Sequence, residues 1–277
     1  MSAAWLNGAF TDGSLKLDAR DRGFLLGDGV FETIAVINHK PLWLTQHLQR
    51  MEAAADELGI PFDRRMSGTG IEAVLGKSQS KLEVMRLTLS RGVTARGIAG
   101  EGSEPSLLVT LDAFATKNLF QPCRLKVSTI RRNEFAPSSR LKTLSYIDGI
   151  MAAREVAGDA DDALMLNTGG HVASSTVANI FLVKNGRLIT PSLDQGILAG
   201  ITRRHLVDNS SKCTEKRVQL SELFNADAVF LANSLRFVRQ VTHINGESLV
   251  TGPLDGIKQV LCGLAQKQCG IDPRGLV

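Results

Sequence analysis

The sequence is poor in cysteine and in aromatic residues, and each scarcity argues against a class of protein. The four cysteines among its 277 residues form no Cys-x-x-Cys pair, which favours reduced thiols over structural disulfides or a thiolate metal site. Only 5% of the residues are aromatic, and the charges that sum to +4 are scattered along the chain. A nucleic-acid-binding face needs basic residues gathered on one surface, so nucleic acid is not an expected partner.

Long apolar runs are also missing. No apolar segment approaches the roughly 20 residues that a membrane-spanning helix requires. The first residues have neither a basic n-region nor an apolar h-region, so we expect no signal peptide, no membrane partner and a cytoplasmic location. A hydrophobic content of 43% and a charged content of 22% are typical of a globular protein, and the mild positive charge suits an anionic small-molecule ligand.

Both halves of the chain mix strand and helix patterns and contain hairpin turns, which predicts an α+β fold with largely antiparallel sheets. Periodicity is lost over 113–122, so we predict an N-terminal domain at 1–113, a linker at 114–122 and a C-terminal domain at 123–277. The expected helices lie at 46–58, 67–77, 146–156 and 254–268, with another beginning at Thr202. The expected strands lie at 34–37, 81–90, 106–111, 124–130, 163–166, 179–183, 188–190 and 228–231, with Asn-Gly hairpin turns at 7–8, 185–186 and 245–246.

Several common catalytic motifs are absent. The glycines at positions 23, 27 and 29 are not followed by Gly-Lys-Ser/Thr, so they do not form a phosphate-binding P-loop. The chain has no Gly-x-Ser-x-Gly turn, no His-Glu-x-x-His helix and no Gly-x-Gly-x-x-Gly after a strand. These absences disfavour a serine hydrolase, a zinc protease and a dinucleotide-binding enzyme.

Two patterns carry chemistry. Lys142 lies between two leucines, and although most lysines are solvated surface charges, desolvation can turn the amine into a nucleophile. Gly200-Ile201-Thr202 enters a predicted helix whose first N–H groups could bind a phosphate, with Arg50 and Ser234 as further contributors. Ordinary capping by Thr202 explains the second pattern equally well. A lysine amine with a phosphate site and no metal-ligand cluster suggests pyridoxal phosphate.

Eight short segments, in the same order, resemble the class IV (fold-type IV) pyridoxal-phosphate enzymes. This family contains branched-chain aminotransferases, D-amino acid aminotransferases and 4-amino-4-deoxychorismate lyases. The resemblance implies a small N-terminal α/β lobe with a mainly antiparallel sheet, a larger β-barrel-like C-terminal lobe with helices that binds the cofactor, and a homodimer. The matching segments are Arg22-Gly-Phe-Leu-Leu-Gly-Asp-Gly-Val-Phe-Glu-Thr33, His47-Leu-Gln-Arg50, Arg91-Gly…Arg96-Gly97, Leu141-Lys142-Thr-Leu, Asn179-Ile-Phe-Leu-Val-Lys-Asn-Gly, Thr190-Pro, Gly200-Ile-Thr-Arg203 and Asn233-Ser-Leu235.

The resemblance also implies roles for single residues toward pyridoxal 5'-phosphate. Lys142 matches the lysine that forms a Schiff base with the cofactor and later moves the proton. Arg50 matches the arginine that binds the cofactor phosphate. Ile201 and Thr202 match the helix-start amides and hydroxyl on that phosphate, and Ser234 matches a further hydroxyl.

Three more residues are implied at the substrate. Arg96 matches an arginine that can bind a substrate carboxylate. Phe31 matches an aromatic residue near the active site. Tyr146 is close to Lys142 in sequence, where some relatives have a tyrosine at slightly different spacing.

One position departs from the family pattern. The family normally has a glutamate paired with the pyridine nitrogen of the cofactor, and the alignment places Ser174 there. A carboxylate would keep that nitrogen protonated, whereas a hydroxyl only forms a hydrogen bond. We therefore expect a weaker electron sink, which handicaps transamination more than elimination. Two alternatives stay open: a carboxylate from another part of the chain contacts the pyridine nitrogen, or the protein is a family member with little activity.

The choice within the family rests on a few positions. Ala178 and Asn233-Ser-Leu235 are similar to the lyase pattern, whereas Ile98 stands where the lyases often have tyrosine and D-amino acid aminotransferases histidine. We favour a 4-amino-4-deoxychorismate lyase, an activity of folate biosynthesis, over an aminotransferase of branched-chain or D-amino acids. A non-catalytic small-molecule-binding protein is the remaining alternative, and retention of Lys142 speaks against it.

Overall fold

The computed structural model describes residues 3–11, 14–100, 102 and 104–277, which group into two compact units. The first unit contains the described residues of Met1–Thr116 with Leu141–Tyr146 and Lys267–Leu276. The second contains Lys117–Arg140, Ile147–Gln266 and Val277. The domain boundaries expected from the sequence, at 1–113, 114–122 and 123–277, stay a prediction. The segment Leu141–Tyr146, called the lysine segment below, groups with the first unit although it follows the expected linker.

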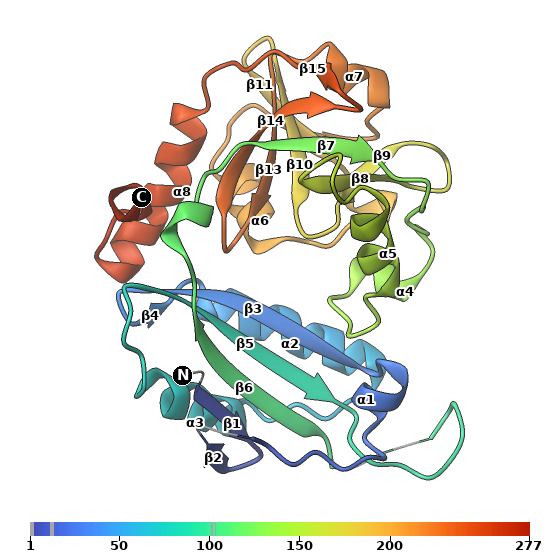
Figure 1. Cartoon of the computed structure of the whole chain (residues 1–277), viewed down its shortest axis with the longest axis vertical. Coiled ribbons are helices and arrows are strands. Elements are labelled where there is room, and N and C mark those ends of the chain that lie inside the picture. The colour runs from blue at the N-terminus through green and yellow to red at the C-terminus, as the bar shows by residue number, and fades with distance from the viewer. Residues whose placement is uncertain (1–2, 12–13, 101, 103) are drawn as a thin grey trace. The chain divides into compact units, whose positions relative to one another are not determined.

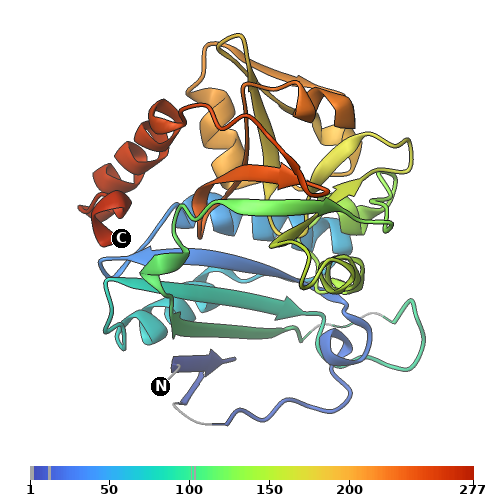
Figure 2. The same cartoon turned by 45° about the horizontal axis from the view of Figure 1, so that its top comes forward.

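The first unit contains a six-stranded antiparallel sheet in the order β2-β1-β6-β5-β3-β4 (Figure 1, Figure 2). The hairpin at its edge turns at Asn7-Gly8, where both residues have the positive φ that this turn requires. Strand β3, next to the edge strand β4, pairs with β5 along its whole length. The strands are β1 (Ala3–Leu6), β2 (Ala9–Thr11), β3 (Gly29–Ile37), β4 (Lys40–Pro41), β5 (Leu82–Ser90) and β6 (Ser106–Ala113).

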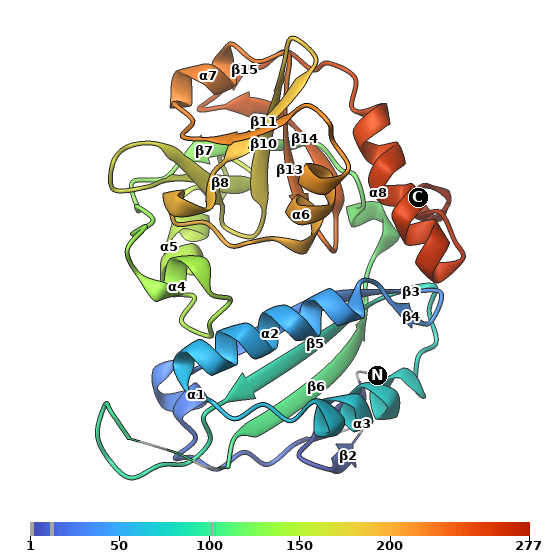
Figure 3. The same cartoon turned by 180° about the vertical axis from the view of Figure 1, so that it is seen from behind.

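Two amphipathic helices, α2 (Leu44–Leu58) and α3 (Arg64–Leu75), cover one face of this sheet, as Figure 3 shows from behind. Their apolar residues, among them Met51 and Ile71, pack on strand residues such as Ile34 and Leu87 in one core. The Asp63 side chain caps α3, and α2 ends at Gly59 in the left-handed conformation. A short helix, α1 (Arg22–Leu26), precedes β3.

The second unit contains a nine-stranded sheet that closes into a barrel (Figure 2). Strands β10, β13, β14, β7, β8 and β9 follow one another around the ring, and the pairing of Asn179 with Ser174 joins β9 back to β10. Three of the pairings, β14–β7, β7–β8 and β11–β12, are parallel. The strands are β7 (Cys123–Val127), β8 (Asp162–Leu166), β9 (Val172–Ser175), β10 (Asn179–Lys184), β11 (Arg187–Pro191), β12 (Cys213–Lys216), β13 (Ala228–Asn233), β14 (Phe237–Ile244) and β15 (Glu247–Ser248).

The remaining helices lie in the second half of the chain. They are α4 (Pro137–Arg140), α5 (Ile147–Glu155), α6 (Ile201–Asp208), α7 (Leu220–Phe224) and α8 (Asp255–Cys269), with short 3-10 turns at Thr116–Asn118, Leu193–Gln195 and Pro273–Leu276. Among the described residues, no helix is both long enough and apolar enough to cross a membrane. The α+β class with an antiparallel first sheet and a barrel-like second sheet is confirmed.

Candidate active site

The lysine segment is paired with the beginning of β3 in the first unit. The N–H of Phe31 donates to the carbonyl of Lys142 at 2.9 Å, and the N–H of Leu144 donates to the carbonyl of Gly29 at 2.8 Å. A Cβ at Gly29 would lie 2.7 Å from Leu144 Cδ1 and 2.3 Å from the carbonyl oxygen of Leu89, so only glycine permits this close approach. The backbone of Lys142 is therefore fixed by β3.

The side chain of Lys142 lies over an aromatic pair. Its Nζ is 4.1 Å from the centroid of the Phe31 ring and 6.0 Å from that of Tyr146. The two rings meet edge to face with centroids 5.6 Å apart. The first unit thus brings together three of the predicted residues, Lys142, Phe31 and Tyr146, and the aromatic faces stabilise the ammonium by a cation–π interaction.

Arg86 is a neighbour that sequence reasoning missed. Its Cζ lies 3.8 Å from the centroid of the Phe31 ring, and its Nε donates to Thr88 Oγ1 at 3.1 Å. Burial lowers the pKa of the Arg86 guanidinium, with Tyr146 acting in the opposite direction. The sequence signal that could have identified Arg86 is a charged residue within the apolar strand expected at 81–90. Two cations on one ring favour an anionic group beside them.

A buried carboxylate fixes Arg50, the candidate phosphate arginine. Glu32 Oε1 and Oε2 accept hydrogen bonds from Nε and Nη2 of Arg50 at 2.7 and 2.6 Å, and Glu32 Oε2 also accepts one from His47 Nδ1 at 2.7 Å. Burial alone would raise the pKa of the Glu32 carboxyl, but the charge of Arg50 and the hydrogen bonds from His47 and Arg50 lower it to about 2. Burial lowers the pKa of His47, so this imidazole is held neutral. Glu32 therefore orients Arg50 through a bidentate pair.

The second unit offers a phosphate site at the N-terminus of α6. Gly200 is the N-cap, and no side chain caps the helix. Thr202 is almost fully buried, and its Oγ1 has no hydrogen-bond partner among the described residues. The alternative that Thr202 merely caps the helix is therefore wrong, because its hydroxyl makes no capping bond. An unsatisfied buried hydroxyl beside free helix-start amides fits a bound phosphate, which would supply the missing partner.

Asn179 connects this helix start with Ser174. A Cβ at Gly200 would lie 2.1 Å from Asn179 Oδ1, and Asn179 pairs with Ser174 across β9 and β10. Ser174 is buried, and its hydroxyl donates to the carbonyl of Ser175 at 2.8 Å. Since its hydrogen is committed there, Ser174 can only accept a hydrogen bond from a further group. Its expected place beside the pyridine nitrogen stays a prediction.

The last two predicted residues lie in loops. Ser234 is half-buried in the turn between β13 and β14, where Asn233 Oδ1 accepts hydrogen bonds from the N–H groups of Leu235 and Arg236. Arg96 is exposed in the loop after β5. Among the residues described, no cluster of three or more His, Cys, Asp or Glu side chains could hold a metal ion.

Comparison with known proteins identifies the family. The model of the family described as amino-transferase class IV matches residues 29–244. The chain belongs to the class IV aminotransferases. The protein is thus an enzyme of this family, and the expected cofactor, pyridoxal 5'-phosphate, is confirmed at the level of the family.

Named relatives of this class IV protein include both lyases and aminotransferases. The chain is 32% identical over 236 residues to an aminodeoxychorismate lyase of Bacillus subtilis, covering 81% of this chain and 80% of the relative. It is 28% identical over 271 residues to an aminodeoxychorismate lyase of Vibrio harveyi, covering 94% and 98%. A candidate branched-chain-amino-acid aminotransferase of Methanocaldococcus jannaschii is 28% identical over 255 residues, with coverages of 87% and 88%.

Solved structures give the same picture of the class IV fold. A candidate 4-amino-4-deoxychorismate lyase of Legionella pneumophila superimposes with a TM-score of 0.84 at 32% identity, covering 92% of this chain and 96% of that one. A branched-chain aminotransferase of Thermoproteus uzoniensis superimposes with a TM-score of 0.84 at 26% identity, covering 97% and 95%.

Proposed function

We propose that this class IV enzyme is a lyase that converts 4-amino-4-deoxychorismate into 4-aminobenzoate and pyruvate. Similarity to two aminodeoxychorismate lyases supports the proposal. The structural observation that carries it is that Arg86 and Lys142 both lie against the Phe31 ring. The substrate has two carboxylates, and Arg86 adds a second candidate partner to the exposed Arg96, whereas a branched-chain amino acid has one carboxylate.

Each unit by itself carries candidate cofactor-binding residues. In the first, Lys142 provides the amine and Arg50, oriented by Glu32, provides charge for the phosphate. In the second, the amides of Ile201 and Thr202, the Thr202 hydroxyl and Ser234 provide hydrogen bonds to the phosphate. When bound, pyridoxal 5'-phosphate supplies an aldehyde for the amine and an electron sink for the reaction.

The protein's own side chains carry out the rest of the reaction. Nζ of Lys142 takes the proton from the amine-bearing carbon of the substrate as a general base. The Phe31 and Tyr146 rings confine the amine, since both lie within 6.0 Å of it. Arg86 and Arg96 bind substrate carboxylates. Loss of pyruvate then makes the substrate ring aromatic, which supplies driving force.

Ser174 suits elimination better than transamination. A serine in place of a carboxylate provides no negative charge to keep the pyridine nitrogen protonated, so the electron sink is weaker. An elimination that is driven by aromatisation tolerates this weakness. A Ser174→Glu variant tests the contact: altered cofactor absorbance or rates are expected, and an unchanged spectrum with unchanged rates contradicts it.

An aminotransferase of branched-chain or D-amino acids is the second candidate. The similarity to a candidate branched-chain-amino-acid aminotransferase over 88% of that relative's length favours it. The Phe31 side chain, which lies against the lysine, would pack equally well on an aliphatic substrate side chain.

An assay of the purified holoenzyme separates the candidates. Release of 4-aminobenzoate from 4-amino-4-deoxychorismate is compared with transfer of an amino group to 2-oxoglutarate. The proposal predicts the first reaction, its loss in Lys142→Ala, and bleaching of the visible absorbance by borohydride only when Lys142 is present. Amino transfer without 4-aminobenzoate release would refute the lyase, and a colourless protein that takes up no pyridoxal phosphate would refute both candidates.

We also propose a homodimer. Helix α1 exposes three consecutive apolar side chains, Phe24, Leu25 and Leu26, with exposed fractions of 73%, 57% and 50%. A contiguous apolar patch of this kind is typical of an interaction surface. Sedimentation equilibrium should give twice the mass of the chain, and a monomer at micromolar concentration would contradict the proposal.

A further inference from the structure

The loop between β5 and β6 carries Arg96, a candidate carboxylate ligand, and exposes it to solvent. Gly97 has a φ of +129°, a conformation that other residues avoid, and Ile98 is 83% exposed. Residues 95–99 are all exposed, and an exposed segment held by no further contact would leave the Arg96 side chain in many positions. A fixed position for Arg96 therefore requires polar contacts to the loop backbone.

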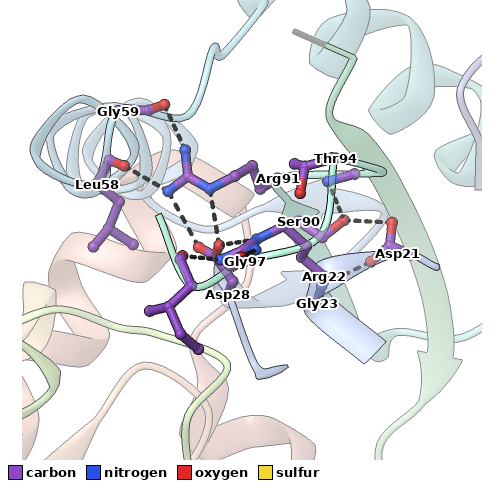
Figure 4. A network of polar contacts seen from close by, with 12 residues as sticks. Asp21, Arg22, Gly23, Asp28, Leu58, Gly59, Ser90, Arg91, Thr94 and Gly97 are labelled. Carbon is purple, nitrogen blue, oxygen red and sulfur yellow. Dashed lines mark hydrogen bonds and ion pairs between the residues drawn. The ribbon is translucent and has the colours of Figure 1, made fainter. Parts of the chain in front are cut away.

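Arg22 makes these contacts with the loop backbone (Figure 4). Its Nη1 donates to the carbonyl of Gly97 and its Nη2 to the carbonyl of Ile98, both at 2.7 Å. Its Nε donates to Asp28 Oδ2 at 2.7 Å, and the side chain is only 8% exposed. The two loop carbonyls directly follow Arg96, and the rigid planar guanidinium spans both at once.

Asp28 ties Arg22 to a second arginine. Arg91 donates to Asp28 Oδ2 from Nε at 2.8 Å, and its Nη1 and Nη2 donate to the carbonyls of Gly59 and Leu58 at the end of α2 (Figure 4). Burial raises the pKa of the Asp28 carboxyl, but the hydrogen bonds and charges of Arg91 and Arg22 outweigh it and lower that pKa. Asp28 is therefore ionised and orients both guanidinium groups.

The backbone that carries Arg22 is itself fixed. Asp21 Oδ1 accepts a hydrogen bond from the N–H of Gly23 at 2.8 Å, and Asp21 Oδ2 accepts bonds from the hydroxyls of Ser90 and Ser106 at 2.7 Å each. The N–H of Arg22 donates to the carbonyl of Gly92. Helix α1 is thus bonded to both ends of the Arg96 loop, while Gly29, immediately after Asp28, holds the lysine segment.

We propose that Arg22 is a positioning residue for substrate binding: through the carbonyls of Gly97 and Ile98 it sets the place of Arg96 relative to Lys142. Arg96 and Lys142 both belong to the first unit. Helix α1 and the start of β3 connect the loop that carries Arg96 with the lysine segment. The inference rests on the proposed function in one respect, because it requires a substrate with a carboxylate for Arg96. Both candidate substrate classes meet this requirement.

The test separates KM from kcat in the holoenzyme. Arg22→Met should raise KM for the carboxylate substrate about tenfold while kcat stays within about twofold, because the chemistry at Lys142 is untouched. Arg22→Lys keeps the charge but cannot reach both carbonyls, so a smaller rise is expected. Arg20→Met is the matched control: Arg20 is 74% exposed, pairs with Asp18 and should leave KM unchanged.

A double variant distinguishes positioning from a general loss of structure. If Arg22 acts through Arg96, adding Arg22→Met to Arg96→Met should raise KM no further. Additive effects, or a loss of kcat without a change in KM, would overturn the proposal.

A second readout needs no turnover. Trypsin cleaves after exposed arginines in mobile loops, so Arg22→Met should accelerate cleavage after Arg96, and an unchanged rate would overturn the proposal. Failure of the lyase function is recognised separately, because wild-type enzyme would then release no 4-aminobenzoate. The KM comparison is in that case made with the amino acid whose amino group the enzyme transfers.

Discussion

Two buried threonines of the second unit differ in one respect that bears on the cofactor. Thr190 Oγ1 donates to the carbonyl of Ile180 at 2.8 Å, whereas Thr202 Oγ1 has no hydrogen-bond partner in the described part of the chain. A buried hydroxyl without a partner costs free energy, and it persists where a ligand satisfies it. At the residue scale, this difference makes Thr202 the candidate ligand residue to test first in the second unit.

Thr202→Val removes this hydroxyl and keeps the shape of the side chain. We expect the dissociation constant for pyridoxal phosphate to rise about ten- to hundredfold, because a hydrogen bond to a charged phosphate is lost. The free energy of unfolding of the apoenzyme should change by less than about 0.5 kcal/mol. Fluorescence titration of the apoenzyme and denaturant unfolding measure the two quantities.

Thr190→Val should behave in the opposite way. It leaves the Ile180 carbonyl without its partner, so the apoenzyme should lose about 1–3 kcal/mol of stability while cofactor affinity is unchanged. Equal effects of the two variants on affinity would show that Thr202 does not contact the phosphate.

At the element scale, the beginning of β3 organises the first unit. It pairs with β5 on one side and with the lysine segment on the other, since Val30 bridges Thr143 and Gly29 bonds Leu144. The same strand supplies Phe31 to the lysine and Glu32 to Arg50. A displacement of β3 would therefore disturb several candidate site residues together.

Gly29→Ala tests this arrangement. The new Cβ would meet the Leu89 carbonyl and the Leu144 side chain, so we expect a loss of about 1–3 kcal/mol in the free energy of unfolding. Because the lysine segment must shift, kcat should fall at least about tenfold. An unchanged kcat in Gly29→Ala would mean that the segment accommodates the extra methyl group.

Gly68, within α3, provides the matched control for Gly29. A Cβ added at Gly68 would have no neighbouring side chain within 4 Å among the described residues. Gly68→Ala should therefore stabilise the protein by about 0.5–1 kcal/mol, because alanine favours the helix, and it should leave kcat unchanged.

At the scale of the whole molecule, acid stability depends on the fully buried Glu32. The pKa of its carboxyl is about 2 in the folded protein against an ordinary value of 4.5, so the folded state binds its proton less readily than the unfolded state. The resulting stabilisation is complete above about pH 4.5 and is lost as the pH falls toward 2. Burial also lowers the pKa of His47, so a further loss of stability begins as the pH falls below the ordinary value of 6.5.

Glu32→Gln should therefore lower the free energy of unfolding at pH 7 by roughly 3–5 kcal/mol, since Arg50 loses its buried partner. The difference from wild type should shrink as the pH falls from about 4.5 to about 2. Urea unfolding at a series of pH values measures it. Glu52→Gln, on the same helix as Arg50, is the control: Glu52 is paired with Arg64 in solvent and should show no comparable dependence on pH. A difference that does not change with pH would show that Glu32 ionisation is not responsible.

Local patterns were sufficient to predict most elements and to propose Lys142 as the catalytic lysine. Apolar residues at helical spacing predicted the helix that begins at Leu44, and the hairpin turns follow from Asn-Gly pairs with positive φ. Lys142 was found because its neighbours match a family motif. Arg86 was missed, since its approach to the Phe31 ring depends on the register between β5 and β3, which no local pattern encodes.

The sequence by itself thus determined the family, the α+β class and the candidate chemistry of Lys142, because these depend on residue types and short-range spacing. Only the tertiary structure decided how the barrel closes, through Ser174 and Asn179, and how Arg22 reaches two carbonyls 75 and 76 residues away. It also showed that the Thr202 hydroxyl makes no capping bond. The physical reason is common to all three: hydrogen bonds between distant residues are selected by the packing of the whole fold, not by the residues beside them in the chain.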